Sequence, residues 1–220
     1  MMNSKKIVVG AAVAASVLLS VISSANAAGR SVAGKSWDAK ERFLIRARAI
    51  GVVPDESSST SIGGEITVAD QIVPEVDFSY FFTDNIAAEL VAAVTPHDMG
   101  AVGTTLGDLD LGDVWLLPPT LTLQYHFNPA GNIRPYAGAG VTYVHYFNVD
   151  SAGFNDIDYD DGFGVALQAG VDIGIDDHWA FNADVKKIFH QVDASVNHGA
   201  VTADVDLDPW VIGVGIAYRF

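Results

Sequence analysis

The sequence predicts an all-β fold, an eight-stranded antiparallel transmembrane β-barrel with short periplasmic turns and long extracellular loops. Half of the residues are hydrophobic (50%). Beyond the amino-terminal segment, however, no apolar run approaches the roughly 20 residues of a transmembrane helix. Large apolar side chains instead recur at every second position, which is the period of a strand. Short turns and long loops alternate along the chain, and this asymmetry is typical of barrels in bacterial outer membranes.

The clearest strand is the last one, at residues 208–220. One of its faces is entirely apolar or aromatic and consists of Trp210, Ile212, Val214, Ile216, Tyr218 and Phe220. The other face is small or charged. The strand ends on an aromatic residue and has another aromatic at its far end, which resembles the terminal strand of outer-membrane barrels, where it serves as the insertion signal. Aromatic girdles mark the two lipid interfaces of such barrels.

The other strands are predicted from the same alternation of apolar and polar side chains. On the first strand, for example, Phe43 and Ile45 face away from Arg46 and Arg48. In chain order we expect strands at residues 42–53, 72–82, 86–94, 116–127, 133–147, 165–173, 179–186 and 208–220.

Turns and loops connect these strands in strict alternation. Asp, Asn, Pro and Gly mark three tight turns, at residues 83–85, 128–132 and 176–178. Four long loops are expected at residues 54–64, 95–113, 148–162 and 189–204. The segment 95–113 is Gly-rich, acidic and too long for a hairpin turn, so we interpret it as a large loop.

Residues 1–27 are interpreted as a secretory signal peptide that is absent from the mature protein. Two lysines precede a short apolar stretch, and the small residues before Ala27 are spaced for cleavage after it. A retained membrane anchor is the alternative, but the stretch is short and rich in Ala for a span. We therefore expect a periplasmic tail at 28–41 and the barrel at 42–220.

Charge and cysteine content limit the possible partners and the source of stability. The formal net charge is −15 at pH 7, and it becomes more negative when Lys5 and Lys6 leave with the signal peptide. Such acidity argues against nucleic acid as a partner. The chain has no cysteine, so the exported domain must be stabilised by its core or by closure of its sheet.

The polar faces of the strands carry the side chains that we predict to line the lumen. They are Arg46, Arg48, Glu75, Asp77, Glu89, Gln124, Gln168, Asp172, Asp184, Lys186 and Arg219. These groups could form a polar path through the barrel. An eight-stranded barrel has room only for its own side chains, however, which favours the interpretation that opposite charges pair and plug the interior.

Four motifs run through the chain in order. They are TDNI at 83–86 followed by Glu89 and Leu90, LPPTLTLQYHF at 117–127, RPYAGAGV at 134–141, and LDPW at 207–210 with a closing YRF at 218–220. Together they resemble the outer membrane protein W family over essentially the whole mature chain, and least in the loops at 54–64 and 148–162. The resemblance implies a narrow, partly hydrophobic lumen, passive uptake of small hydrophobic molecules, as in the family's alkane-uptake proteins, and a link to stress response.

Apolar side chains at the outer rim are candidates for a gate that opens sideways into lipid. They are Trp115, Leu116 and Leu117 at the start of the fourth strand, and Phe163 between two glycines. Pro118 and Pro119 lack amide hydrogens and interrupt the ladder there, which favours a lateral gap. The alternative is that these are ordinary interfacial residues.

We predict no catalytic, cofactor or metal site. The segment 155–162 resembles the start of a calcium loop, but it lacks the distal bidentate Glu and its glycine comes one position late. The histidines are scattered without metal-ligand spacing, and no Ser-His-Asp arrangement can be defined. An enzyme would need His97 with Asp98, or His190 with Asp193, at the outer rim. The sequence therefore indicates a protein that is not an enzyme.

The favoured function is a porin-like outer-membrane channel for passive uptake of small hydrophobic molecules, with lateral exit to lipid. The alternatives are a structural or adhesive barrel with a plugged lumen, and a soluble periplasmic lipocalin-like binder with its apolar residues inside. Expected partners are outer-membrane lipid and lipopolysaccharide, small hydrophobic solutes, periplasmic chaperones and the barrel-assembly machinery. All of this depends on the apolar face of the sheet pointing outward, toward lipid.

Overall fold

A computed structural model describes residues 41–60, 63–105, 107–150, 157–196 and 201–220. The signal peptide predicted at 1–27, and nearly all of the predicted tail, lie outside these residues. The described chain forms β1 (Phe43–Val53), β2 (Glu56–Thr60), β3 (Glu65–Val68), β4 (Gln71–Phe81), β5 (Ile86–Ala93), β6 (Thr95–Thr104), β7 (Gly107–Leu117), β8 (Thr120–His126), β9 (Ile133–Asp150), β10 (Ile157–Tyr159), β11 (Gly162–Gly174), β12 (Trp179–Val196), β13 (Val201–Leu207) and β14 (Trp210–Arg219). No helix within the described ranges is long and apolar enough to cross a membrane.

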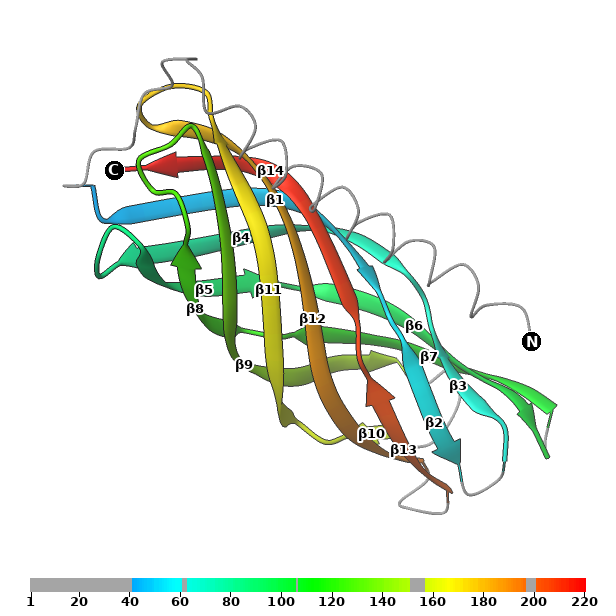
Figure 1. Cartoon of the computed structure of the whole chain (residues 1–220). Helices are drawn as coiled ribbons and strands as arrows, with labels where there is room; N and C mark the ends of the chain where they lie inside the picture. The colour runs from blue at the N-terminus through cyan, green and yellow to red at the C-terminus, as the bar shows by residue number, and fades with distance from the viewer. Residues whose placement is uncertain (1–40, 61–62, 106, 151–156, 197–200) are drawn as a thin grey trace.

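Eight of these strands close into an antiparallel barrel (Figure 1). Their order around the ring is β1, β4, β5, β8, β9, β11, β12 and β14, and β14 pairs again with β1. The Phe43 amide donates to the Phe220 carbonyl (3.0 Å), and the Phe220 amide donates to the Phe43 carbonyl (2.9 Å). The first and last strands thereby satisfy each other's backbone groups, as lipid requires. The predicted eight-stranded barrel is confirmed.

The apolar face of the barrel strands points outward, as the sequence predicts. On β4, Phe78 is 42% exposed while the adjacent Asp77 is 1% exposed. On β8, Leu123 is 59% exposed and Gln124 is 1% exposed. A lipocalin-like binder would bury Phe78 and Leu123, so that alternative is wrong.

Aromatic side chains gather near both rims of the barrel. At the end that holds the carboxyl terminus, Phe43 lies 5.5 Å from Phe78 and 5.8 Å from Phe220, measured between ring centroids. Near the other end, the rings of Tyr143 and Phe163 are 5.0 Å apart. These groups correspond to the aromatic girdles of outer-membrane barrels.

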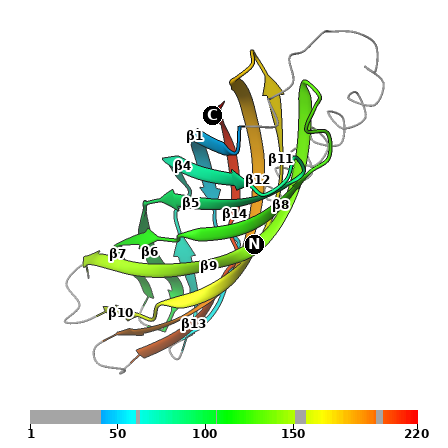
Figure 2. The same ribbon diagram turned by 90° about the vertical axis from the view of Figure 1, so that its left-hand side faces the viewer.

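Beyond one rim the wall continues as an extracellular extension, which consists of β2, β3, β6, β7, β10, β13 and the far ends of β9 and β12 (Figures 1 and 2). The four predicted long loops are therefore largely wrong. The segment 95–113 is instead the hairpin of β6 and β7, turned by Gly103 and Gly107 with positive φ values of 69° and 91°. In the same way β2 lies within 54–64, the end of β9 and β10 lie within 148–162, and β12 and β13 occupy much of 189–204.

The direction of the apolar side chains reverses between barrel and extension. On β6, Met99 is buried inside and Asp98 is exposed, which is the opposite of the barrel strands. The reason is that the barrel wall faces lipid, whereas the extension faces water and must bury its apolar side chains within. The extension therefore surrounds an apolar interior.

Candidate functional site

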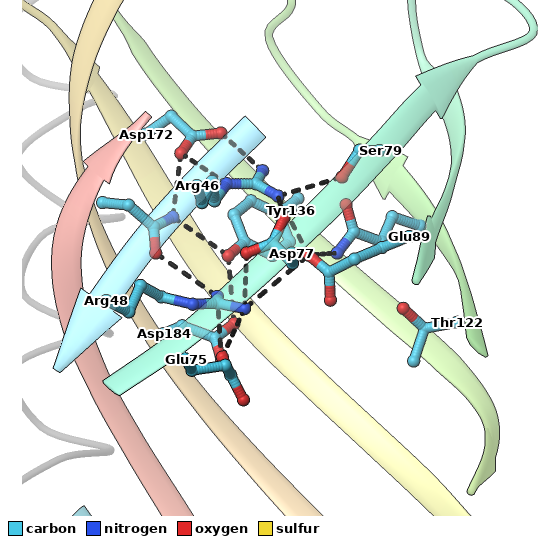
Figure 3. Close-up of polar contacts among 12 residues, drawn as sticks. Arg46, Arg48, Glu75, Asp77, Ser79, Glu89, Thr122, Tyr136, Asp172 and Asp184 are labelled. Carbon is cyan, nitrogen blue, oxygen red and sulfur yellow. Dashed lines mark hydrogen bonds and ion pairs between the residues drawn. The ribbon is translucent and has the colours of Figure 1, made fainter. Parts of the chain in front are cut away.

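The middle of the barrel interior is filled by an ion-pair network, which begins with Arg46 on β1 (Figure 3). Arg46 contacts Asp172 at two points, Nη2 to Oδ2 at 2.9 Å and Nε to Oδ1 at 3.2 Å. Its Nη1 atom lies 2.9 Å from Glu89 and 3.2 Å from Asp77. One guanidinium therefore ties β1 to β4, β5 and β11.

Arg48 binds the carboxylates of the next level of the network (Figure 3). Its Nη2 atom lies 2.7 Å from both Glu75 and Asp77, and its Nη1 atom lies 3.5 Å from Asp184. Lys186 adds a second cation, with Nζ 3.5 Å from Glu75. The register of β1 and β4 sets this pairing, because it places Glu75 directly opposite Arg48.

Neutral side chains complete the network. Gln124 Nε2 donates to Glu89 at 2.8 Å, and Gln168 Nε2 donates to Glu89 and Asp184, both at 2.9 Å. The Tyr136 hydroxyl donates to Asp184 at 3.0 Å. Each of these carboxylates is thus bound from several sides, which is the condition for keeping a charge buried.

The buried charges of the described barrel balance. The cationic side chains are Arg46, Arg48, Arg134, Lys186 and Arg219, and the anionic ones are Glu75, Asp77, Glu89, Asp172 and Asp184, each at most 5% exposed. Burying an unpaired charge is expensive, and pairing offsets that cost. A hydrated ion entering this level would have to displace existing pairs, so the geometry suits a plug better than a polar path.

All eleven predicted lumen residues have buried side chains, and ten of them meet in the network. Arg219 does not. Its Nε donates to the Glu41 carbonyl at 2.8 Å, and its guanidinium carbon lies 4.1 Å from the centre of the Phe81 ring. It belongs to the end of the barrel that holds the carboxyl terminus.

The predicted lumen residues do not include Tyr136 and Asn182, which are members of the network, although Asn182 shares the polar strand face of Asp184 and Lys186. Asn182 Nδ2 donates to Asp172 at 2.8 Å and to the Tyr136 hydroxyl at 3.1 Å. A signal was available, because Tyr136 lies on the same face of its strand as Gly138 and Gly140, opposite the face of the outward Ala137 and Val141. Gly170 stands directly opposite Tyr136, and a Cβ atom there would collide with the tyrosine ring.

Above the network the interior becomes apolar. The first level consists of Ile50, Val52, Val73, Ala93, Ala166, Ile188 and Val211. The second fills the extension and consists of Ile66, Met99, Ala101, Leu111, Val114, Val144, Tyr146, Val192, Val205 and Leu207. From the extension down to the network, an apolar solute would therefore meet mainly apolar side chains.

The four predicted rim-gate residues do not form one cluster. Trp115 is on the outer face, 38% exposed, with its ring 6.2 Å from that of Phe147. Phe163 is also outside and 78% exposed. Leu116 points the other way and packs against the apolar cluster of the extension. Leu117 is half-buried at the end of β7.

The predicted gap at Pro118 and Pro119 is short. These prolines split the predicted strand 116–127 into β7 and β8, because neither can donate to the ladder. Pairing with β9 stops at Leu117–His145 and resumes at Thr120–Thr142, and the Tyr143 amide donates across the break to the Pro119 carbonyl at 3.1 Å.

A longer break, which sequence reasoning missed, lies between β4 and β6. Pairing of β4 with β5 stops at Glu75–Ala93, and pairing along this seam resumes only at Val68–Met99, between β3 and β6. We call residues 70–74 facing residues 94–97 the wall interruption. It contains a proline on each side, Pro74 and Pro96, neither of which has an amide hydrogen. It lies level with Val73 and Ala93 of the lower apolar cluster.

The polar side chains of the extension bind neighbours within the protein. Asp161 accepts hydrogen bonds from the Tyr146 amide (3.0 Å), from the His145 ring (2.7 Å) and from the Tyr143 hydroxyl (2.9 Å), and this holds the pKa of Asp161 below its usual range. His190 Nε2 is 3.1 Å from the Tyr146 hydroxyl.

The two histidines considered as catalytic candidates are buried. Burial lowers the pKa of both His97 and His190. Among the described residues, no group of three or more His, Cys, Asp or Glu could hold a metal ion. Asn155 and Asp156 of the calcium-like segment lie outside those residues.

Comparison with known proteins agrees with this architecture. The chain is 45% identical to the uncharacterized outer-membrane protein y4mB of Sinorhizobium fredii, over 81% of this chain and 80% of that protein. It is 35% identical to outer membrane protein W of Vibrio cholerae, over 81% of this chain and 88% of the relative. The crystal structure of OprG from Pseudomonas aeruginosa superposes with a TM-score of 0.78 at 32% identity, covering 86% of this chain and 99% of OprG. A model of the OmpW family matches residues 39–220, and the chain belongs to this family of outer-membrane β-barrel proteins.

Proposed function

We propose that the protein lets small hydrophobic molecules cross the outer membrane passively, through the interior of the extension and then sideways into lipid. The observation that carries this proposal is a juxtaposition. An apolar interior ends on a charged network, and the wall interruption lies beside the last apolar level. No cofactor, catalytic step or energy input is part of the proposal.

The energetics favour apolar solutes over ions along this route. An apolar molecule gains roughly 25 cal/mol for each Å² of surface that leaves water when it enters the extension, and it keeps this gain when it passes on into lipid. A hydrated ion gains nothing from the apolar level and meets paired charges below it. Selectivity would therefore follow from polarity and size.

The route is tested by bridging the wall interruption. Because the chain has no cysteine, Ile72→Cys with Pro96→Cys can be joined by a short thiol-reactive bridge without side reactions. We expect uptake of a small apolar dye or alkane into proteoliposomes to fall toward the rate of protein-free liposomes. A bridge between Leu121→Cys and Val141→Cys, which are directly paired on the outer face of intact ladder, is the matched control. Equal uptake with and without the first bridge would contradict the proposed route.

A structural or adhesive barrel remains the second candidate, because a lumen filled by the ion-pair network would equally serve a barrel that transports nothing. The two functions differ in the uptake assay. If proteoliposomes take up apolar solutes no faster than protein-free liposomes, the structural function is favoured.

The proposed partners are the lipid and lipopolysaccharide around the barrel, the solutes, and the chaperones and assembly machinery that would receive the carboxyl-terminal strand. The outer face of the extension carries Asp98, Asp113 and Asp150 in cross-strand register. Beside the phosphates of lipopolysaccharide, such carboxylates would need divalent cations between them as a diffuse bridge.

A further inference from the structure

One side chain spans the upper border of the wall interruption. The His97 ring on β6 reaches from inside the wall to the backbone carbonyl of Ala69, with Nδ1 3.2 Å from the oxygen. Beside it, the Ala69 amide donates to the Asp98 carbonyl at 3.2 Å. These two hydrogen bonds stand where pairing of β3 and β6 ends and the wall interruption begins.

The chemistry of the contact between His97 and Ala69 determines which group donates the hydrogen bond. A backbone carbonyl can only accept, so the hydrogen bond requires the proton to be on Nδ1 of His97. The ring is 4% exposed and comes from an inward position of β6, directly opposite Val114. In such surroundings water competes little for the hydrogen bond, which makes the bond worth more than it would be on the surface.

We propose that His97 is a latch that sets how far the wall interruption extends, and hence how readily an apolar solute leaves the barrel sideways. This proposal rests on the proposed function. His97 acts as a positioning residue, because it holds the β3–β4 backbone against β6 and need not touch the solute. The adjacent Pro96 cannot donate to the ladder, so this end of the seam is held by the backbone hydrogen bond from Ala69 to Asp98 and by the His97 side chain.

The test compares His97→Phe and His97→Gln. Phenylalanine fills similar space in an apolar surrounding but has no N–H, whereas the glutamine amide can still donate to Ala69. We expect hydrogen exchange of the Ala69 amide to be about fivefold faster in the Phe variant, as for loss of one net hydrogen bond, and to return toward wild type in the Gln variant. Protection of the Val141 amide, in intact ladder, reports that the barrel is folded in both variants.

Uptake is measured on the same proteins. His97→Phe is expected to take up the apolar probe faster than wild type, and this gain should vanish when Ile72→Cys and Pro96→Cys are bridged. Unchanged hydrogen exchange of the Ala69 amide in His97→Phe would contradict the proposed role of His97. The same holds if the Ala69 amide exchanges as fast in His97→Gln as in His97→Phe. If the Ala69 amide exchanges faster but uptake is no higher than in protein-free liposomes, the proposed function would be overturned. That result would still support a role for His97 in holding β6 against the backbone between β3 and β4.

Discussion

Arg46 joins carboxylates from three strands, so its removal should be among the more damaging single changes in the barrel. Arg46→Met keeps an unbranched apolar stem but leaves Asp77, Glu89 and Asp172 buried without their shared cation. Breaking one partner out of a buried ion network typically costs about 3–5 kcal/mol. We expect a loss of that size in the free energy of unfolding, measured by denaturant titration in lipid vesicles.

Arg42→Met provides the comparison for that experiment. The Arg42 guanidinium is at the barrel end and makes an exposed hydrogen bond to the Phe82 carbonyl at 3.4 Å. Its loss should change the free energy of unfolding by less than about 1 kcal/mol. Equal effects of the two substitutions would show that the buried network contributes little to stability.

The hairpin of β6 and β7 carries a repulsive row of carboxylates on its outer face. Asp113 is directly opposite Asp98 on β6 and Asp150 on β9. A side-chain hydrogen bond with Asp98, followed by desolvation and repulsion from Asp98, Asp150 and Asp110, raises the pKa of Asp113. A raised carboxyl pKa means that the folded hairpin holds this proton more tightly than the unfolded chain does. Protonation of Asp113 therefore stabilises the folded hairpin fully at pH values below the ordinary pKa range of Asp. This contribution is lost as the pH rises through the raised pKa of Asp113.

Asp113→Asn should therefore stabilise the hairpin at neutral pH and have little effect in acid. We expect hairpin amides to exchange about twofold more slowly than in wild type at neutral pH, with the two proteins converging below the ordinary pKa range of Asp. Asp84→Asn, in an exposed periplasmic turn, should leave the hairpin unchanged. A constant ratio of the exchange rates across this pH range would contradict the assignment.

The strands of the barrel could be predicted because lipid enforces one pattern along them. Arg46 and Arg48 alternate with outward apolar neighbours on β1, and the same logic placed Glu75 and Asp77 inside. In the extension water replaces lipid, so the pattern reverses, and segments rich in Gly and Asp look like loops although they pair as strands. The loop predicted at 95–113 is wrong for this reason, because the length of the segment is taken up by two strands and a glycine turn.

The wall interruption could not be predicted, because it depends on which strands meet. Pro118 and Pro119 are adjacent in sequence and therefore predict a break in the ladder, yet the Tyr143 amide bridges that break. Pro74 and Pro96 are far apart in sequence and come together only through the register of β4 and β5. The same holds for His97, whose partner Ala69 lies between β3 and β4, in a segment for which the sequence predicts neither a strand nor a loop. The pattern along a single strand predicts on which face each side chain lies. A break between two strands can be located only when the pairing of strands in the closed barrel is known.

At the scale of the whole molecule, the proposed function gives ions and apolar solutes separate routes, and these routes should respond to different substitutions. Ions would have to pass the ion-pair network in the middle of the barrel, whereas apolar solutes are proposed to leave above it. The double variant Arg46→Ala with Asp172→Ala removes a cation and an anion together, so it opens the network without adding net charge. We expect single-channel recordings to show higher ion conductance for this variant than for wild type, while uptake of the apolar probe stays the same. The bridge between residues 72 and 96 should do the reverse, lowering apolar uptake with conductance unchanged. If the double variant altered both readouts together, ions and apolar solutes would share one path, and the lateral route would have to be abandoned.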